Sequence, residues 1–231
     1  MQPLAAGPAA AAPAELQAVL FDMDGLLVDT EPLWFEAESQ VMARLGGRWD
    51  ESDQQFLVGG SLPRTVEYLL GRAAAPASRD EVAGWLVGGM AGLVASRGVR
   101  MLPGAARLLA EVVAAGIPHA LVTSSEREIM TAVLSRIGVS FPVTVCADDV
   151  AAAKPDPEPY LLAAARLGAS PACCVVLEDS PNGVAAAEAA GCRLIAVPSL
   201  APVPARPGRV VVASLAQVDL ARLRAMVPAA S

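Results

Sequence analysis

Two residue types that often carry catalysis are almost absent from this chain of 231 residues, which has one histidine, His119, and one lysine, Lys154. A single histidine excludes catalytic schemes that need two, and it also excludes a histidine-rich metal site. The four cysteines have no CxxC spacing and lie in apolar runs. We therefore expect free buried thiols in a reducing cytoplasm, and neither disulfides nor zinc ligands.

Long hydrophobic runs and basic segments are missing as well. The longest uncharged stretch in the middle of the chain, Val82 to Ser96, has 15 residues and is broken by glycines. A membrane-spanning helix needs about 20 apolar residues. A net charge of −7 and a pI near 4.8 disfavour binding to nucleic acid or to an anionic membrane. Residues 1–16 contain no basic residue, which predicts a disordered, low-complexity tail and not a signal peptide.

The chain has a repeating pattern after residue 100. A helix-like segment, a glycine and a short apolar run that ends in polar residues follow one another several times. The glycines that fall where a helix is expected to end are Gly116, Gly138, Gly168 and Gly191. This alternation predicts an α/β fold with a doubly wound, Rossmann-like parallel sheet, in which ligands bind beyond the carboxyl ends of the strands.

Helix starts within this pattern are marked by capping residues. Ser125 with Glu128 fits a capping box. The pairs Asp156-Pro157 and Ser180-Pro181 each fit an N-cap residue followed by proline at the first helical position. These three points therefore predict where helices leave the polar edge of the sheet.

The stretch from residue 33 to residue 99 breaks the pattern. Three helical segments are predicted at 32–47, 61–74 and 78–98, with no strand between them, and all three tryptophans lie in this stretch. We infer an α-helical cap inserted into the α/β core after the first strand. The expected division is a tail at 1–16, the core at 17–32 and 100–231, and the cap at 33–99.

Carboxylates, hydroxyls and the single lysine follow the predicted strands at one edge of the sheet. The first strand ends in Asp22-Met23-Asp24-Gly25, where the glycine permits a sharp turn that crowds the two carboxylates. The polar residues that follow the later strands are Thr123-Ser124-Ser125, Lys154 and Glu178-Asp179-Ser180. Aspartate and glycine are also common in ordinary turns, and Lys154 also fits an ordinary surface lysine. The Asp148-Asp149 pair is a competing set of metal ligands, although a solvated loop also explains it.

Four segments of the sequence resemble, in order, the signature motifs of the haloacid dehalogenase superfamily. They are FDMDGLLVDTEPLW, LVTSS, KPDPEPY and LEDSPNGVAAAEAAG, and the resemblance spans about residues 17 to 200. It is closest to the β-phosphoglucomutase-like and sugar-phosphatase branch, which has a helical cap after the first strand. The resemblance therefore implies phosphoryl transfer to and from an aspartate.

The resemblance also implies a role for each matching residue. Asp22 is the expected nucleophile and Asp24 the expected general acid and base. Thr123, the backbone amide of Ser124, and Lys154 are expected to bind the phosphoryl group. The expected Mg²⁺ ligands are Asp22, Asp179 and the carbonyl group of Asp24, with Glu178 binding directly or through water.

The charges of these residues support a metal independently of the resemblance. Asp22, Asp24, Glu178, Asp179 and Lys154 together carry a net charge of −3, which would repel a phosphate dianion. A hard divalent cation bound by carboxylate oxygens offsets much of that charge, and phosphoryl transfer depends mainly on such stabilisation. We therefore expect Mg²⁺ as the cofactor.

Two residues at or in the cap are weaker candidates for contacts with the substrate. Glu31 follows the first motif directly, and Arg64 follows a glycine pair in a segment suited to a mobile specificity loop. Each is equally consistent with a surface charge or a residue at a helix end.

Three functions fit these residues. We expect a Mg²⁺-dependent phosphatase that acts as a monomer on a small phosphorylated metabolite, a sugar phosphate in particular. The alternative is a phosphomutase, but mutases of this branch carry a histidine in the first cap helix, and His119 lies on a predicted core strand. A receiver-like phospho-switch is disfavoured because it needs no cap and only about half this length.

Overall fold

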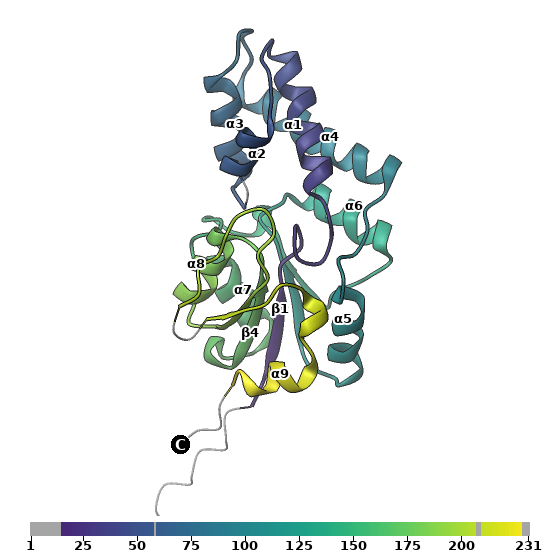
Figure 1. The fold of residues 1–231 in the computed structure, drawn as a ribbon, viewed down its shortest axis with the longest axis vertical. Coiled ribbons are helices and arrows are strands. Elements are labelled where there is room, and N and C mark those ends of the chain that lie inside the picture. The colour runs from purple at the N-terminus through teal and green to yellow at the C-terminus, as the bar shows by residue number, and fades with distance from the viewer. Residues whose placement is uncertain (1–14, 58, 207–208, 228–231) are drawn as a thin grey trace, which may run out of the picture.

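The protein, seen here in a computed structural model that describes residues 15–57, 59–206 and 209–227, is organised around a six-stranded parallel sheet (Figure 1). The strand order is β3-β2-β1-β4-β5-β6, and all the pairings are parallel. The strands are β1 Ala18–Phe21, β2 His119–Val122, β3 Val143–Val145, β4 Cys174–Glu178, β5 Arg193–Ala196 and β6 Val210–Val211. Most of the predicted tail, residues 1–14, lies outside the described residues.

Helices cover both faces of this sheet, which confirms the doubly wound α/β fold. Helices α5, α6 and α9 lie on one face, and α7 and α8 lie on the other (Figure 1). Their bounds are α5 Ala105–Ala114, α6 Arg127–Ile137, α7 Glu158–Leu167, α8 Pro181–Ala189 and α9 Leu220–Ala225. None of the helices within the described ranges is long and apolar enough to cross a membrane.

Alternation along the central strand explains why the sheet needs two layers of helices. Val19 and Phe21 pack into the core on the side of α5 and α6, whereas Ala18 and Leu20 pack on the side of α7 and α8. All four side chains are completely buried. A strand with apolar residues on both faces is stable only when both faces are covered.

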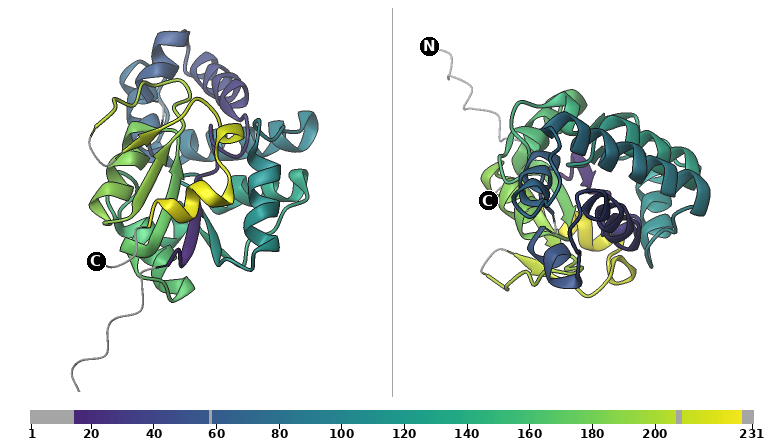
Figure 2. Two further views of the ribbon diagram at one scale, coloured as in Figure 1. Left: turned by 60° about the horizontal axis from the view of Figure 1, so that its bottom comes forward. Right: turned by 90° about the horizontal axis from the view of Figure 1, so that it is seen from above.

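Four further helices stand over the carboxyl end of the sheet (Figures 1 and 2). They are α1 Glu31–Arg44, α2 Glu51–Leu57, α3 Leu62–Gly71 and α4 Arg79–Arg97. Helices α1, α3 and α4 share a small apolar core of their own that includes Met42, Leu69 and Leu86, and α4 also packs against α6 of the sheet layer. The sequence predicted only three helical segments here, because α2 is a short polar helix without apolar periodicity.

The chain leaves the sheet layer and returns to it through two segments that lie side by side. Val28 forms an antiparallel bridge with Met101. The backbone amide of Asp29 donates to the carbonyl of Arg100 at 3.0 Å, and the amide of Leu102 donates to the carbonyl of Leu27 at 2.9 Å. The four-helix unit is therefore attached to the sheet by a two-stranded connection.

The predicted helix ends agree with the structure at some positions and differ at others. The four predicted terminal glycines all have positive φ angles, and the Ser180 hydroxyl caps α8 by accepting from the Gly183 amide at 3.1 Å. The predicted capping box at Ser125 is wrong, because α6 begins after Glu126 and the Ser125 hydroxyl points to Asp24. Helix α7 begins one residue later than predicted, at Glu158.

The core of the four-helix unit provides a test of its packing. Leu86 is completely buried on α4, so Leu86→Ala is expected to lower the free energy of unfolding by about 2–5 kcal/mol. Leu161→Ala on α7 is the control, because its side chain is 42% exposed. It should cost about 0.5 kcal/mol or less. Urea unfolding followed by tryptophan fluorescence measures both, and equal losses would contradict the assignment of Leu86 to this core.

Candidate functional site

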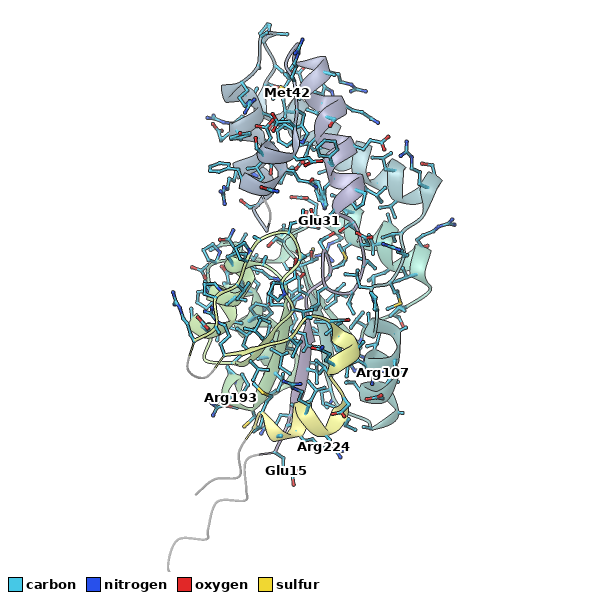
Figure 3. All side chains as sticks on the ribbon, in the orientation of Figure 1. Glu15, Glu31, Met42, Arg107, Arg193 and Arg224 are labelled. Atoms are coloured by element: carbon cyan, nitrogen blue, oxygen red, sulfur yellow. The ribbon has the colours of Figure 1, made fainter. Side chains whose placement is uncertain are left out.

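A cleft lies between the carboxyl end of the sheet and helices α1–α3 above it. Glu31, labelled in Figure 3, lies at the level where the two parts meet. The predicted residues that line the cleft are Asp22, Asp24, Glu31, Thr123, Ser124, Lys154 and Asp179. The strand ends therefore bring residues that are far apart in the sequence to one place.

The ammonium group of Lys154 forms the centre of the cleft floor. It donates to Asp22 Oδ1 at 2.6 Å, to Glu178 Oε1 at 2.6 Å and to the backbone carbonyl of Val122 at 2.9 Å. Its side chain is only 3% exposed. The one lysine of the chain is therefore a buried, fully hydrogen-bonded cation that joins β1, β2 and β4.

Burial and mutual repulsion dominate the ionisation of these groups. Burial raises the pKa of Asp22 to about 8, since the attraction of Lys154 only partly opposes it and Glu178 and Asp24 add repulsion. Burial alone would lower the pKa of Lys154, but the neighbouring carboxylates of Asp22 and Glu178 outweigh it and raise that pKa. Lys154 therefore remains charged, but its single positive charge does not balance the carboxylates around it.

Three buried carboxylates, those of Asp22, Glu178 and Asp179, could hold a metal ion. Each offers an oxygen atom that lies within 4.8 Å of the others. Burial raises the pKa of Asp179 well above its usual range, and repulsion by Asp22 and Glu178 adds to this. An all-oxygen donor set with excess negative charge fits a hard divalent cation. The side chain of Asp24 is outside this cluster.

Gly25 allows the turn after β1 to approach Asp179 closely. Its φ angle is +76°, and a Cβ atom at this position would lie 2.2 Å from Asp179 Oδ2. A larger residue would therefore be strained in its backbone and would displace a candidate metal ligand.

The carboxylate of Asp24 is held by three hydroxyl groups. Thr30 donates to Oδ1 at 2.7 Å, while Thr123 and Ser125 donate to Oδ2 at 3.1 and 2.8 Å. Thr123 therefore orients Asp24 in this structure, in addition to lining the cleft. Ser125 was missed as a site residue because its spacing suggested a helix cap.

Glu178 is the most heavily hydrogen-bonded carboxylate of the site. It accepts five hydrogen bonds, from Lys154, from the hydroxyl of Tyr160 at 2.8 Å, and from the Asp179 amide and the Ser180 amide and hydroxyl. The Lys154 ammonium also lies 4.9 Å from the centre of the Tyr160 ring. Tyr160 was not predicted, since a buried aromatic residue on a helix usually only fills the core.

Two other predicted candidates lie away from the cleft. Arg64 does not line it, because its guanidinium donates to the Phe56 carbonyl at 2.8 Å and lies over the Phe56 ring. The Asp148 carboxylate accepts from the Arg127 amide at 2.7 Å, and Asp149 pairs with the side chains of Arg127 and Arg166. The Asp148-Asp149 pair therefore serves the start of α6 and is no part of the carboxylate cluster.

Three glutamates, Glu31, Glu38 and Glu126, line the cleft. Burial raises the pKa of Glu38 to about 8, with added repulsion from Glu31 and Asp53. Burial likewise raises the pKa of Glu31 to about 7 and that of Glu126 to about 7. Gln54 donates to the Glu31 carboxylate at 3.2 Å. Sequence patterns missed Glu38 and Glu126, because a glutamate on a helix usually faces solvent.

The raised pKa of Glu38 predicts a pH-dependent stability. Because the folded-state pKa of about 8 exceeds the ordinary value of 4.5, folded protein keeps a proton that unfolded chain releases. Stability should therefore fall as pH rises between these values. Glu38→Gln removes the titration, so its Tm should fall less than that of the wild type between about pH 5.5 and pH 8. Glu51→Gln, at an exposed position of α2, is the control. Parallel profiles for the wild type and Glu38→Gln would contradict the prediction.

Comparison with known proteins identifies relatives of this chain. The family model of the haloacid dehalogenase-like hydrolases matches residues 16–191. Hexitol phosphatase B of Escherichia coli is 37% identical over 194 residues, which cover 81% of this chain and 86% of the relative.

Solved structures agree with this relationship. A mutant of CbbY from Rhodobacter sphaeroides in complex with xylulose-1,5-bisphosphate has a TM-score of 0.83 and 30% identity, covering 90% of this chain and 99% of that chain. β-Phosphoglucomutase from Clostridium difficile shares the fold with a TM-score of 0.78 at 23% identity, over 92% of this chain and 97% of that chain. The chain belongs to the haloacid dehalogenase-like hydrolases.

Proposed function

We propose that the protein is a Mg²⁺-dependent phosphatase that hydrolyses a small phosphorylated metabolite, a sugar or hexitol phosphate in particular, through an aspartyl-phosphate on Asp22. The observation that carries the proposal is the convergence of Asp22, Asp24, Lys154 and Asp179 at the floor of one covered cleft. A hexitol phosphatase among the relatives supports the substrate class.

The first step would transfer the phosphoryl group to the protein. An oxygen of Asp22 attacks phosphorus, the bond from phosphorus to the substrate oxygen breaks, and Asp24 gives a proton to that oxygen. Lys154 lies 2.6 Å from Asp22 Oδ1 and stabilises negative charge on the transferring group. Thr123 and the backbone of Ser124, at the same edge of the cleft, would bind the phosphoryl oxygens.

The second step would hydrolyse the aspartyl-phosphate. Asp24, now deprotonated, removes a proton from water, and the resulting oxygen nucleophile attacks phosphorus and releases Asp22. The hydroxyls of Thr30, Thr123 and Ser125 hold Asp24 in one orientation for both proton transfers. Glu178 would position Lys154 through its hydrogen bond to the ammonium group, in addition to its proposed contact with the metal.

Members of the family generally use a divalent metal, and we propose Mg²⁺ here. The oxygens of Asp22 and Asp179, the backbone carbonyl of Asp24 and, directly or through water, Glu178 would hold the ion. When bound, it supplies positive charge that offsets the carboxylates and the phosphate. Burial and mutual repulsion raise the pKa of Asp22 and of Asp179, and a bound cation would oppose both effects.

Hydrolysis is favoured over phosphoryl return to the sugar. The only histidine of the chain, His119, begins β2, and its ring lies 2.9 Å from the Ile117 carbonyl, before the strand and away from the cleft. The first helix over the cleft instead presents Glu31, Trp34 and Glu38. A histidine gate of the mutase kind is therefore missing. The helices above the floor also distinguish this site from a receiver-like phospho-switch, which needs no cover.

We further infer a monomer that works in the cytoplasm on a small molecule, without nucleic acid or membrane partners. The four free thiols support a reducing compartment. Helices α1–α4 support the division into a core at 17–32 and 100–231 and a cap at 33–99, with Glu31 on the substrate side.

Product analysis tests the reaction. With Mg²⁺ and hexose 1- and 6-phosphates or hexitol phosphates, we expect free phosphate to form and the isomeric sugar phosphate to be minor. EDTA should abolish phosphate release and added Mg²⁺ should restore it. Isomer formation that is faster than phosphate release would identify a mutase, and activity in EDTA would exclude the metal role.

Substitution of the nucleophile tests the intermediate. Asp22→Asn should lower kcat by about 10³-fold or more, because an amide cannot form the aspartyl-phosphate. The fold should survive, since the neutral amide relieves carboxylate crowding around Asp179. Asp80→Asn, at an exposed position in the first turn of α4, is the control and should keep full activity. Phosphate release and Tm are measured together, and an active Asp22→Asn protein would remove Asp22 from this role.

A further inference from the structure

Asp179 has the weakest hydrogen-bonded support among the three carboxylates that could hold a metal ion. Asp22 accepts from the charged ammonium group of Lys154, and Glu178 accepts five hydrogen bonds. In the described part of the chain, the Asp179 carboxylate accepts only from the hydroxyl of Ser199, which donates to Oδ2 at 2.5 Å. Asp179 is 3% exposed, so loss of this hydroxyl would leave a buried carboxylate without a donor.

Repulsion from the neighbouring carboxylates acts to move Asp179 out of the cluster. The negative charges of Asp22 and Glu178 disfavour a charged Asp179, whereas the hydrogen bond from Ser199 favours it. A hydroxyl that donates to a carboxylate stabilises its charged form and fixes the direction of its two oxygen atoms. Ser199 therefore holds Asp179 in the orientation in which its other oxygen faces the cluster.

Ser199 approaches Asp179 from outside the cleft. It is exposed on the loop after β5 and lines a second cavity, together with Gly25 and Ser214, but it does not line the cleft. Gly25 leaves room for the contact, because a Cβ atom at its position would lie 2.2 Å from Asp179 Oδ2 and 3.1 Å from Ser199 Oγ. Ser199 can therefore act on Asp179 without touching a substrate in the cleft.

The hydrogen bond at Oδ2 leaves Oδ1 as the one oxygen atom of Asp179 that has no donor among the residues described. Asp22 is in the same situation, since Lys154 donates to its Oδ1 and leaves its Oδ2. Ca²⁺ takes about six to eight oxygen ligands and often binds both oxygens of one carboxylate. Mg²⁺ is smaller, keeps several water molecules and usually takes one or two carboxylates. One free oxygen on each of these carboxylates therefore fits Mg²⁺ better than Ca²⁺.

Resting on the Mg²⁺-dependent function proposed above, we propose that Ser199 is a positioning residue for the metal site, where its hydroxyl restricts Asp179 to one metal-binding oxygen and so favours Mg²⁺ over Ca²⁺. Ser199 touches neither the substrate nor the metal in this arrangement. It acts only through Asp179, so its loss changes how tightly and how selectively the cation binds.

A matched pair of substitutions isolates the hydroxyl. Ser199→Thr and Ser199→Val introduce side chains of nearly the same shape, and only the first keeps the donor. Calorimetric titration of the full-length, metal-free protein with Mg²⁺ should give Ser199→Val a Kd about tenfold or more above that of Ser199→Thr. Ser199→Thr should stay within about threefold of the wild type, because strain from the added methyl group is common to both variants. Equal Mg²⁺ affinities of the two variants would overturn the proposal.

The preference between the two cations has its own measurement. Titration of the same two variants with Ca²⁺ gives the ratio of the Kd for Ca²⁺ to the Kd for Mg²⁺. This ratio should be about fivefold or more lower in Ser199→Val than in Ser199→Thr, because Asp179 Oδ2 becomes free to bind the larger ion. An unchanged ratio would contradict the restriction of Asp179 to one oxygen.

Ser214 provides a control within the second cavity. Its hydroxyl donates to the Pro103 carbonyl at 3.0 Å and accepts from the Ala216 amide at 3.1 Å, so it supports the fold without contacting Asp179. Ser214→Ala should lower the Tm and leave the Mg²⁺ affinity within about twofold of the wild type. A loss of Mg²⁺ affinity in Ser214→Ala as large as that in Ser199→Val would show that Ser199 only supports its loop.

Activity measurements keep this inference separate from the proposed reaction. Ser199→Val should need about tenfold more Mg²⁺ than Ser199→Thr for half-maximal phosphate release from a hexitol phosphate. Its KM for that substrate at saturating Mg²⁺ should stay within about twofold of the wild type, because Ser199 lies outside the cleft. No phosphate release from the wild type, together with the difference in Mg²⁺ affinity, would refute the phosphatase alone. Phosphate release with equal Mg²⁺ affinities would refute the role of Ser199 alone.

Discussion

The ammonium group of Lys154 lies between the buried carboxylates of Asp22 and Glu178, and the ends of three strands depend on that contact. An unpaired buried charge costs several kcal/mol, so loss of the lysine would leave two such charges at the centre of the sheet edge. Tyr160 and the residues after Glu178 supply the remaining donors that Glu178 needs. The floor of the cleft is therefore organised before any ligand arrives.

The two halves of the cleft differ in origin and in charge. The sheet provides the floor, where one cation, Lys154, lies among several buried carboxylates. The helices α1–α3 provide most of the roof, which includes Glu31 and Glu38. In the proposed reaction, the phosphoryl group would contact the floor and the rest of the substrate would contact the roof.

The sequence allowed prediction of the parallel sheet and of the residues at its edge, because carboxyl ends of parallel strands must converge. That constraint places Asp22 and Lys154 together although 132 residues separate them. The convergence of strand ends does not predict which side chains outside the strands will contact these residues. Ser125 was assigned to a helix cap and Tyr160 had no assigned role, since local spacing does not show which atom a side chain reaches in space. Glu38 was missed for a related reason. A glutamate on a helix is usually solvated, and only the fold shows that this one is buried.

The side-by-side connection at Val28 and Met101 has an evolutionary consequence. Because the outgoing and returning segments are neighbours, removal of everything between them would leave two adjacent chain ends that a short turn could join. The sheet and its catalytic edge would keep their connectivity, and a different set of helices could enter at the same position. The helices that cover the cleft could therefore be exchanged without any change in the connections between the strand ends that form its floor.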